Sequence, residues 1–278
     1  MKLQTIVDIK PSAWKIGYED KILLLGSCFS DEIGERMEQC CLPVIRNPFG
    51  TLYNPLSIAN AINLQSPIFN LQFHDGLWHS MYHHGSFSRP TREEAEQAVR
   101  ASIETMQKAL QEASVVIVTF GTAWVYEMNG EIVGNCHKLP ESDFTRRRLS
   151  VEEIVAAWKP ILERYPDKHW LFTVSPIRHI KDGLHENQLS KATLLMAVEK
   201  LTLPFREGQG VGYFPAFEIM LDELRDYRFY ADDLVHPSSL AVDYIWERLV
   251  DTFCTNQTKN ELVLQHKRWK HEHHIPLH

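Results

Sequence analysis

The sequence has no long apolar run and no excess of positive charge. Its 278 residues include 29 Lys and Arg against 36 Asp and Glu, a formal net charge of −7. A dedicated nucleic-acid-binding protein normally shows a basic face, so this balance argues against one. No stretch approaches the roughly 18 apolar residues of a membrane span, and residues 1–18 lack the apolar core of a signal peptide. We therefore expect neither a nucleic-acid partner nor membrane association.

Cysteine is scarce, and its count is odd. An odd number of thiols cannot all pair within one chain, and their spacing indicates no disulfide framework. The five cysteines are Cys28, Cys40, Cys41, Cys136 and Cys254. Because free thiols persist in a reducing compartment, we expect a cytoplasmic protein.

Short apolar runs alternate with segments of helical periodicity along the chain. The expected strands are residues 21–25, 114–120, 170–174 and 212–217. The expected helices are residues 30–41, 56–64, 91–112, 150–165, 190–201 and 238–253. Strands that alternate with helices in this way predict an α/β fold with a parallel sheet. We expect a single domain over residues 1–256, followed by a basic tail over residues 257–278.

A strand-to-helix turn with nucleophilic side chains follows the first apolar run, at Gly26-Ser27-Cys28. Free N–H groups and the helix dipole favour negative charge at a helix N-terminus. This position is expected to lower the pKa of a thiol there and to stabilise an oxyanion. The competing interpretation is that Cys28 is a small buried apolar side chain, as free cysteines often are.

A second candidate lies in the loop before the last expected helix, where Asp233 precedes His236 by three residues. Pro237 follows the histidine and favours an extended or turn conformation. A carboxylate at this spacing can turn back and orient the imidazole, as in a catalytic triad. The alternative is a surface loop with a chance histidine, since the chain has 14 of them.

Together these motifs resemble the SGNH (GDSL-like) hydrolase superfamily and, more closely, its GSCFA family. The resemblance covers about residues 20–255. It is carried by residues 26–30 (GSCFS), 47–50 (NPFG), 120–124 (FGTAW), 134–138 (GNCHK), 175–178 (SPIR), 190–192 (SKA) and 227–237 (YRFYADDLVHP). It implies a three-layer α/β/α, flavodoxin-like fold with a parallel central sheet. It also implies an Asp-x-x-His block, which Asp233 and His236 match.

The resemblance places the nucleophile at the first turn. The superfamily pattern there is Gly-Asp-Ser, with Ser as the nucleophile. Aligned without gaps, it puts Cys28 at the nucleophile position and Ser27 where the Asp would stand. A shifted alignment makes Ser27 the nucleophile. We favour Cys28.

The implied oxyanion hole is less complete. The superfamily uses the N–H of the nucleophile, a Gly N–H from a second block and an Asn side chain from a third. Gly50 matches the Gly. The third block corresponds to residues 121–124 (GTAW), which lack the Asn. Gly121 and Thr122 are the candidates there, and Asn135 can fold back into the site.

Histidines cluster between residues 73 and 90, where a hairpin or irregular insertion is expected. His79, His83 and His84 lie near aromatic side chains and can bind a metal or line a sugar-binding cleft. No acidic cluster accompanies them. We therefore expect a structural or substrate-lining role and no metal site.

Two cations, Arg178 and Lys191, lie within the matched blocks. They can contact an anionic substrate or cofactor, or form surface salt bridges.

Two functions remain in competition. The first is an acyl-ester hydrolase or acyltransferase that forms a covalent acyl-enzyme on Cys28 or Ser27. Its substrate would be an acyl ester of a small molecule or carbohydrate, with no cofactor; acyl-CoA would serve as co-substrate for a transferase. The second is a non-catalytic ligand- or carbohydrate-binding module on a decayed hydrolase scaffold. The absent Asn favours the second, and the Asp233–His236 pair favours the first.

Overall fold

Five parallel strands form the centre of the computed structural model, which describes residues 4–64, 70–203 and 210–273. Their order is β10-β9-β5-β1-β2, and every neighbouring pair is parallel. The strands are β1 (Ile22–Gly26), β2 (Val44–Arg46), β5 (Val115–Phe120), β9 (His169–Val174) and β10 (Val211–Phe214). This is the flavodoxin-like order, with a topological switch between β1 and β5. The expected α/β fold is confirmed.

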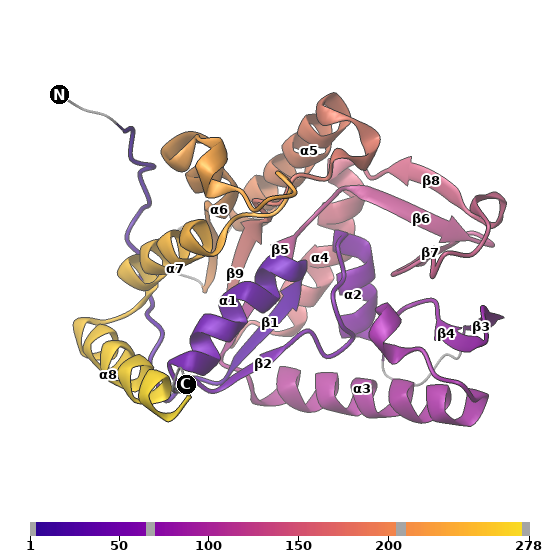
Figure 1. Cartoon of the computed structure of the whole chain (residues 1–278), viewed down its shortest axis with the longest axis horizontal. Helices are drawn as coiled ribbons and strands as arrows, with labels where there is room; N and C mark the ends of the chain where they lie inside the picture. Colours follow the sequence, from indigo (N-terminus) through magenta and orange to yellow (C-terminus); the bar gives the residue numbers. More distant parts are fainter. Residues whose placement is uncertain (1–3, 65–69, 204–209, 274–278) are drawn as a thin grey trace, which may run out of the picture.

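Helices cover both faces of this sheet (Figure 1). One face packs against α1 (Cys28–Gln39), α6 (Ala216–Glu218), the π-helical η5 (Ile219–Leu224), α7 (Ser239–Phe253) and α8 (Asn256–Glu272). The other packs against α2 (Pro55–Asn63), α3 (Arg92–Glu112), α4 (Val151–Arg164) and α5 (Leu184–Thr202). Successive side chains of β1 point to opposite faces of the sheet and so divide the core into two clusters. Leu24 packs in the cluster on the α1 and α7 face, whereas Leu23 and Leu25 pack in the cluster on the α2 to α5 face.

Local sequence signals set several helix starts. The capping boxes expected at Thr91 with Glu94 and at Ser150 with Glu153 are both formed. By contrast, α5 begins at Leu184, six residues before the expected start, after Gly183 with no side-chain cap.

Two small antiparallel sheets interrupt the strand–helix alternation. The expected insertion is the hairpin of β3 (Leu71–His74) and β4 (Leu77–Ser80). A three-stranded sheet of β6 (Trp124–Met128), β7 (Glu131–Val133) and β8 (Thr145–Arg148), which periodicity did not predict, follows β5. Both lie at one end of the molecule, opposite α7 and α8 (Figure 1). The connections include the 3₁₀ turns η1 (Gly85–Phe87), η2 (Glu141–Asp143), η3 (Ile180–Asp182) and η6 (Tyr227–Phe229).

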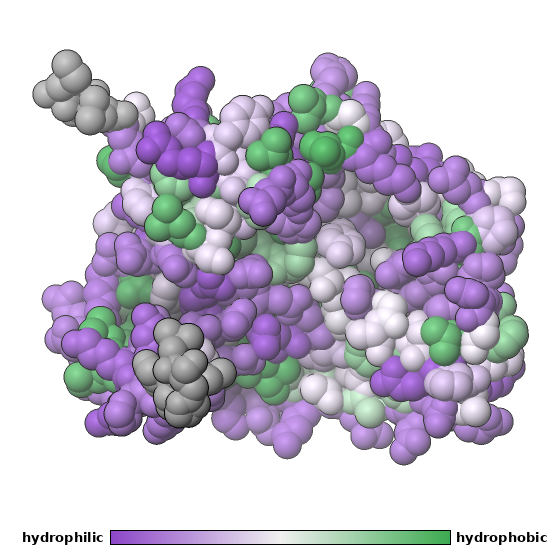
Figure 2. All heavy atoms as spheres, in the orientation of Figure 1, coloured by the Kyte–Doolittle hydropathy of each residue, from purple (hydrophilic) through white to green (hydrophobic). Residues whose placement is uncertain are grey.

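The basic C-terminal segment forms helix α8 as far as Glu272. Its Leu262 is only 4% exposed and belongs to the core cluster that also includes Phe253 and Cys40. Polar side chains cover most of the face seen in Figure 2, and apolar ones are scattered over it. Within the described ranges, no helix has the length and apolar composition needed to cross a membrane.

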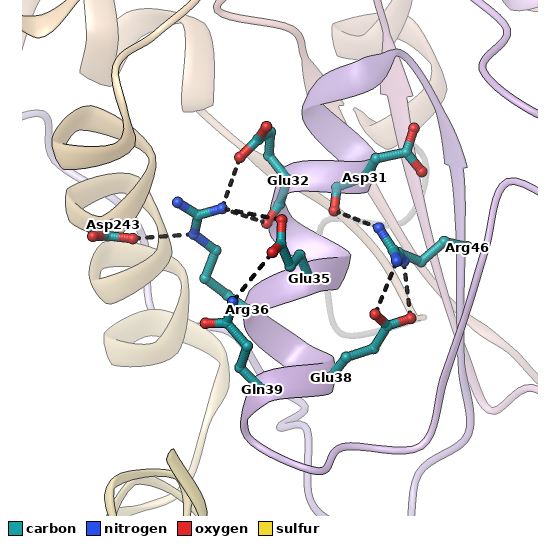
Figure 3. A network of polar contacts seen from close by, with 8 residues as sticks. All are labelled: Asp31, Glu32, Glu35, Arg36, Glu38, Gln39, Arg46 and Asp243. Carbon is teal, nitrogen blue, oxygen red and sulfur yellow. Dashed lines mark hydrogen bonds and ion pairs between the residues drawn. The ribbon is translucent and has the colours of Figure 1, made fainter. Parts of the chain in front are cut away.

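An ionic network holds α1 between β2 and α7 (Figure 3). On one side, the Arg46 guanidinium donates to both oxygens of Glu38 at 2.9 Å. On the other, Arg36 Nε donates to Asp243 at 3.0 Å, and its Nη1 donates to Glu32 at 2.7 Å. The network therefore helps fix the helix that begins at Cys28 beside the helix that follows the Asp233–His236 loop.

Candidate active site

The turn after β1 can be built only on glycine at its first position. Gly26 has a φ of +131°, and a Cβ there would lie 2.1 Å from the Thr119 carbonyl oxygen. Ser27 is the N-cap of α1, and Cys28 is the first residue of the helix. The helix thus begins two residues earlier than expected. Ser27 is 0% exposed, whereas Cys28 is partly exposed.

The topology brings this turn beside the end of β5. Since β1 and β5 are parallel neighbours, Gly26 pairs with Thr119, and the loop carrying Gly121 and Thr122 follows directly. Ligands of open α/β sheets bind at the carboxyl ends of the strands, at the switch point. The candidate residues of the two loops therefore lie where this fold normally places a site.

The Cys28 thiol does not behave as its helix position alone predicts. Burial, Asp31 and Glu32 raise its pKa, while the backbone N–H groups of Cys28 and Phe29 lower it. The balance is a pKa raised to about 11, so the expected net lowering is wrong. Desolvation of the thiolate outweighs the helix terminus. At neutral pH the group is a thiol and needs a base to attack.

Asp233 and His236 form the expected pair. Asp233 Oδ2 lies 2.6 Å from His236 Nδ1, and Oδ1 accepts from the backbone N–H groups of Val235 and His236 at 2.8 and 2.9 Å. These hydrogen bonds lower the pKa of Asp233 to about 2, and the one from the backbone N–H of His236 has the largest effect. With Nδ1 engaged by the carboxylate, Nε2 is the imidazole nitrogen left for proton transfer.

Arg178 ties this loop to the sheet. Its backbone N–H donates to the Val235 carbonyl at 3.1 Å, and its Nη1 donates to the Leu234 carbonyl at 3.0 Å. The guanidinium also lies 5.4 Å from the ring centroid of Tyr230. Arg178 follows β9, so its contacts anchor the loop before α7 to the carboxyl edge of the central sheet.

Three buried polar groups meet at Gly121. Lys191 Nζ donates to the Gly121 and Ser175 carbonyls, each at 2.7 Å. Ser27 Oγ and His179 Nε2 are buried, and neither has a hydrogen-bond partner among the described residues. A Cβ on Gly121 would lie 3.3 Å from both Ser27 Cβ and His179 Nε2. Burial, followed by the charge of Lys191, lowers the pKa of His179 to about 3, so its imidazole is neutral.

The expected oxyanion N–H groups have partners within the protein. Gly50, at a φ of +71°, donates to the Asn47 carbonyl at 2.7 Å. The N–H groups of Gly121 and Thr122 donate to the Tyr53 carbonyl at 2.8 and 2.9 Å. Each would have to exchange its partner to bind an oxyanion.

Side chains that could supply further donors are also engaged. The Thr122 hydroxyl lies 3.1 Å from Ser190 Oγ. Asn135 lies after β7, beside Met81, and its Oδ1 accepts from the His137 N–H at 2.9 Å. The structure therefore brings Thr122, but not Asn135, to the end of β5.

The match to a family model extends over most of the chain. The GSCFA family model matches residues 21–249. The chain belongs to the GSCFA family. No curated protein sequence matches it. A matching solved structure is a family two carbohydrate esterase from Clostridium thermocellum, determined in complex with cellohexaose. That protein is 14% identical, with 93% of this chain and 67% of the esterase covered, at a TM-score of 0.40.

The histidines of this GSCFA-family protein's insertion have protein partners. His79 binds Ser88 Oγ at 2.7 Å and the His74 carbonyl at 3.0 Å. His83 is fully buried between Ser80 and Ser102, at 2.7 and 2.8 Å. His84 caps η1. No group of three or more His, Cys, Asp or Glu in the described parts of the chain is arranged to hold a metal.

Two residues of this site were missed or misjudged from the sequence. His179 directly follows the matched block at residues 175–178, which comes after a predicted strand. That position was the one sequence signal that could have marked His179 as a candidate site residue. Lys191 was expected on the surface or at a substrate. It is 1% exposed, because α5 turns it inward toward the strand ends.

Proposed function

We propose that the protein is an acyl-ester hydrolase or acyltransferase that forms a thioester on Cys28. One observation carries the proposal: the 2.6 Å Asp233–His236 pair belongs to a loop that Arg178 anchors at the same sheet edge as the Cys28 turn. An oriented imidazole and a nucleophile at a helix N-terminus are the parts that acyl transfer requires.

Exposure favours Cys28 over Ser27 as the nucleophile. The Ser27 hydroxyl is buried, and Ser27 Cβ packs against Gly121, whereas the Cys28 side chain is partly exposed. A nucleophile must reach a carbonyl carbon, which a fully enclosed hydroxyl cannot do without rearrangement. The ungapped alignment of Gly26-Ser27-Cys28 with Gly-Asp-Ser favours the same residue, because it puts Cys28 at the nucleophile position.

Acylation begins from the neutral thiol. Because its pKa is raised to about 11, His236 Nε2 takes the proton as Sγ bonds to the ester carbonyl carbon. The N–H groups of Cys28 and Phe29 stabilise the oxyanion. When this tetrahedral intermediate collapses, the bond between the carbonyl carbon and the alcohol oxygen breaks. The imidazolium of His236 then gives its proton to the leaving alkoxide. Asp233 holds the ring and stabilises its positive charge.

Deacylation repeats these steps with a second nucleophile. Water, or an acceptor hydroxyl, gives its proton to His236 as it attacks the thioester carbonyl. The carbon–sulfur bond then breaks, and the proton restores the thiol. Hydrolysis and transfer differ only in this nucleophile, and acyl-CoA would be the donor in a transfer reaction. The family resemblance favours an acyl ester of a small molecule or carbohydrate as the substrate.

A binding module without chemistry is the second candidate. It is favoured by the absent Asn and by the internal partners of the Gly50, Gly121 and Thr122 N–H groups. In that role the Asp233–His236 pair would bind a ligand polar group and no acyl-enzyme would form.

Trapping the acyl-enzyme separates these roles. The protein is incubated with p-nitrophenyl acetate and digested, and acetylated peptides are located by mass spectrometry. We expect an adduct on Cys28, lost in Cys28→Ala and retained in Ser27→Ala. Cys136→Ala is the matched control, since Cys136 is also partly exposed and burial raises its pKa to about 11. An adduct on Ser27 would reassign the nucleophile, and no adduct in any variant would favour the binding module.

A further inference from the structure

Asn47 uses all four of its polar groups to join the segments around the turn after β1. It is 9% exposed and directly follows β2. Its side-chain Oδ1 accepts from the Gly26 N–H at 2.8 Å, and its Nδ2 donates to Asp31 Oδ1 at 2.9 Å. Its backbone N–H donates to the Leu24 carbonyl at 2.9 Å, and its carbonyl accepts from the Gly50 N–H at 2.7 Å. One residue therefore contacts the end of β1, the first turn of α1 and the loop after β2.

The carboxylate of Asp31 is held by two donors from this loop. Its Oδ1 accepts from Asn47 Nδ2, and its Oδ2 accepts from the Thr51 hydroxyl at 3.2 Å. Asp31 lies in the first turn of α1, three positions after Cys28. The segment that carries the nucleophile is thus held before Cys28, at Gly26, and after it, at Asp31, by the same buried amide.

Asparagine suits both the backbone and the partners at position 47. Its φ is +39°, in the left-handed region, where asparagine is several-fold enriched among non-glycine residues. Glycine also adopts this conformation but has no side chain to offer. Aspartate has the acceptor for the Gly26 N–H, but its carboxylate has no hydrogen to donate to Asp31. An amide supplies the acceptor and the donor together.

The segment that Asn47 holds contains the groups that the proposed chemistry uses. The Cys28 and Phe29 N–H groups lie at the start of α1, where N–H groups have no partner within the helix. In the proposed reaction they stabilise the oxyanion, and the Cys28 thiol attacks. Their direction depends on how the segment from Gly26 to Asp31 is held.

We propose that Asn47 is a positioning residue, which fixes the direction in which the Cys28 thiol and the first N–H groups of α1 face the substrate. The inference rests on the proposed function. Asn47 acts through the turn and does not itself touch the reacting atoms. Because a displacement of about 1 Å can lower a rate on the order of 10²-fold, a residue that only holds the turn has a large effect on catalysis.

The test removes the amide or exchanges its partners. Asn47→Gly keeps the left-handed backbone and removes the side chain, and Asn47→Asp sets two carboxylates against each other. Combining Asn47→Asp with Asp31→Asn exchanges acceptor and donor, so the hydrogen bond between the two positions forms again. We expect kcat on p-nitrophenyl acetate to fall about 10- to 100-fold in each single variant at position 47, with KM nearly unchanged. The double variant should recover most of this loss, and a folded double variant without recovery would overturn the proposal.

Asn54→Gly is the matched control. Asn54 is 6% exposed and caps α2, where it accepts from the Ser57 N–H at 2.8 Å and donates to the Ser57 hydroxyl at 2.9 Å. It therefore loses two buried side-chain hydrogen bonds, as Asn47→Gly does. We expect Asn54→Gly to lower stability in urea unfolding and to leave kcat nearly unchanged. A loss of kcat as large as in Asn47→Gly would reduce the effect of Asn47 to general destabilisation and contradict the proposal.

Hydrogen exchange gives a readout that needs no turnover. The amide hydrogens of residues 22–33 are followed by mass spectrometry in the wild type and in both Asn→Gly variants. We expect exchange there to be about tenfold faster in Asn47→Gly, because the Gly26 N–H loses its buried acceptor, and unchanged in Asn54→Gly. Thr51→Val, which removes one donor to Asp31, serves if Asn47→Gly does not fold. Unchanged exchange in the folded variant contradicts the proposal.

The two proposals fail differently. If exchange over residues 22–33 responds to Asn47 while Cys28→Ala keeps full esterase activity, the proposed function fails and Asn47 still holds the turn. If Cys28→Ala is inactive while the folded variants at position 47 keep the kcat of the wild type, only this inference fails.

Discussion

The Asp233 carboxylate holds His236 at two places, accepting from the ring at Nδ1 and from the backbone N–H of the same residue. Both side chains are half exposed, so the loop backbone orients the ring without help from a surrounding core. Val235, between them, donates to the same carboxylate and accepts from Arg178. The pair is therefore preorganised by hydrogen bonds to the loop and to the sheet edge.

Replacing the carboxylate should reduce catalysis and spare the fold. Asp233→Asn puts an amide against Nδ1 and favours the wrong imidazole tautomer. We expect kcat on p-nitrophenyl acetate to fall on the order of 10²- to 10⁴-fold, with an unchanged circular dichroism spectrum. Asp232→Asn, at the exposed neighbouring carboxylate, is the control and should match the wild type. If both variants are fully active, Asp233 does not orient a catalytic base.

Acid should destabilise the fold through His83. Burial lowers the pKa of this histidine from 6.5 to about 3, so between these values the unfolded chain binds a proton that the folded chain does not. Stability therefore falls as pH decreases below about 6.5. In His83→Gln, the slope of unfolding free energy against pH should flatten by up to about 1.4 kcal/mol per pH unit between about pH 6 and 4. Urea titrations at several pH values measure this slope, and His84→Asn should leave it unchanged.

Trp158 should contribute strongly to stability. It is fully buried, packs edge-on against Phe120 and Phe172, and donates from Nε1 to the Pro55 carbonyl at 3.0 Å. We expect Trp158→Ala to cost about 3–5 kcal/mol in urea unfolding. Phe73→Ala, at a ring that is 58% exposed, should stay within about 0.5 kcal/mol of the wild type. Similar losses in both variants would place Trp158 outside the cooperative core.

The ion pair between α1 and α7 should add little to the free energy of unfolding, but a double-mutant cycle should detect a coupling free energy between its two side chains. In the network of Figure 3 the Asp243 side chain is 59% exposed and the Arg36 side chain 13%, so solvent screens their attraction from the Asp243 side. A double-mutant cycle with Arg36→Ala and Asp243→Ala should give a coupling free energy of about 0.5–1 kcal/mol, smaller at high salt. Arg92 and Glu96, an i,i+4 pair within α3, provide a reference cycle. Zero coupling at low salt would mean that the network does not hold the two helices.

The sequence could predict the strands whose two faces are both buried. β1, β5 and β9 occupy the centre of the sheet, so their residues form continuous apolar runs that are visible without a structure. β2 was missed because it is a short, partly exposed edge strand. β8 was missed because its sequence, TRRR, carries no apolar alternation, and only its pairing with β6 makes it a strand.

At the site, the sequence by itself determined the residue types and their places at strand ends. The turn at Gly26, the Asp233–His236 spacing and the family motifs are local patterns. Only the tertiary structure decided the electrostatics, because the burial of a side chain depends on how distant segments pack around it. It raised the pKa of the Cys28 thiol against the helix terminus. It also placed the buried ammonium of Lys191 against the carbonyls of Gly121 and Ser175, which follow β5 and β9.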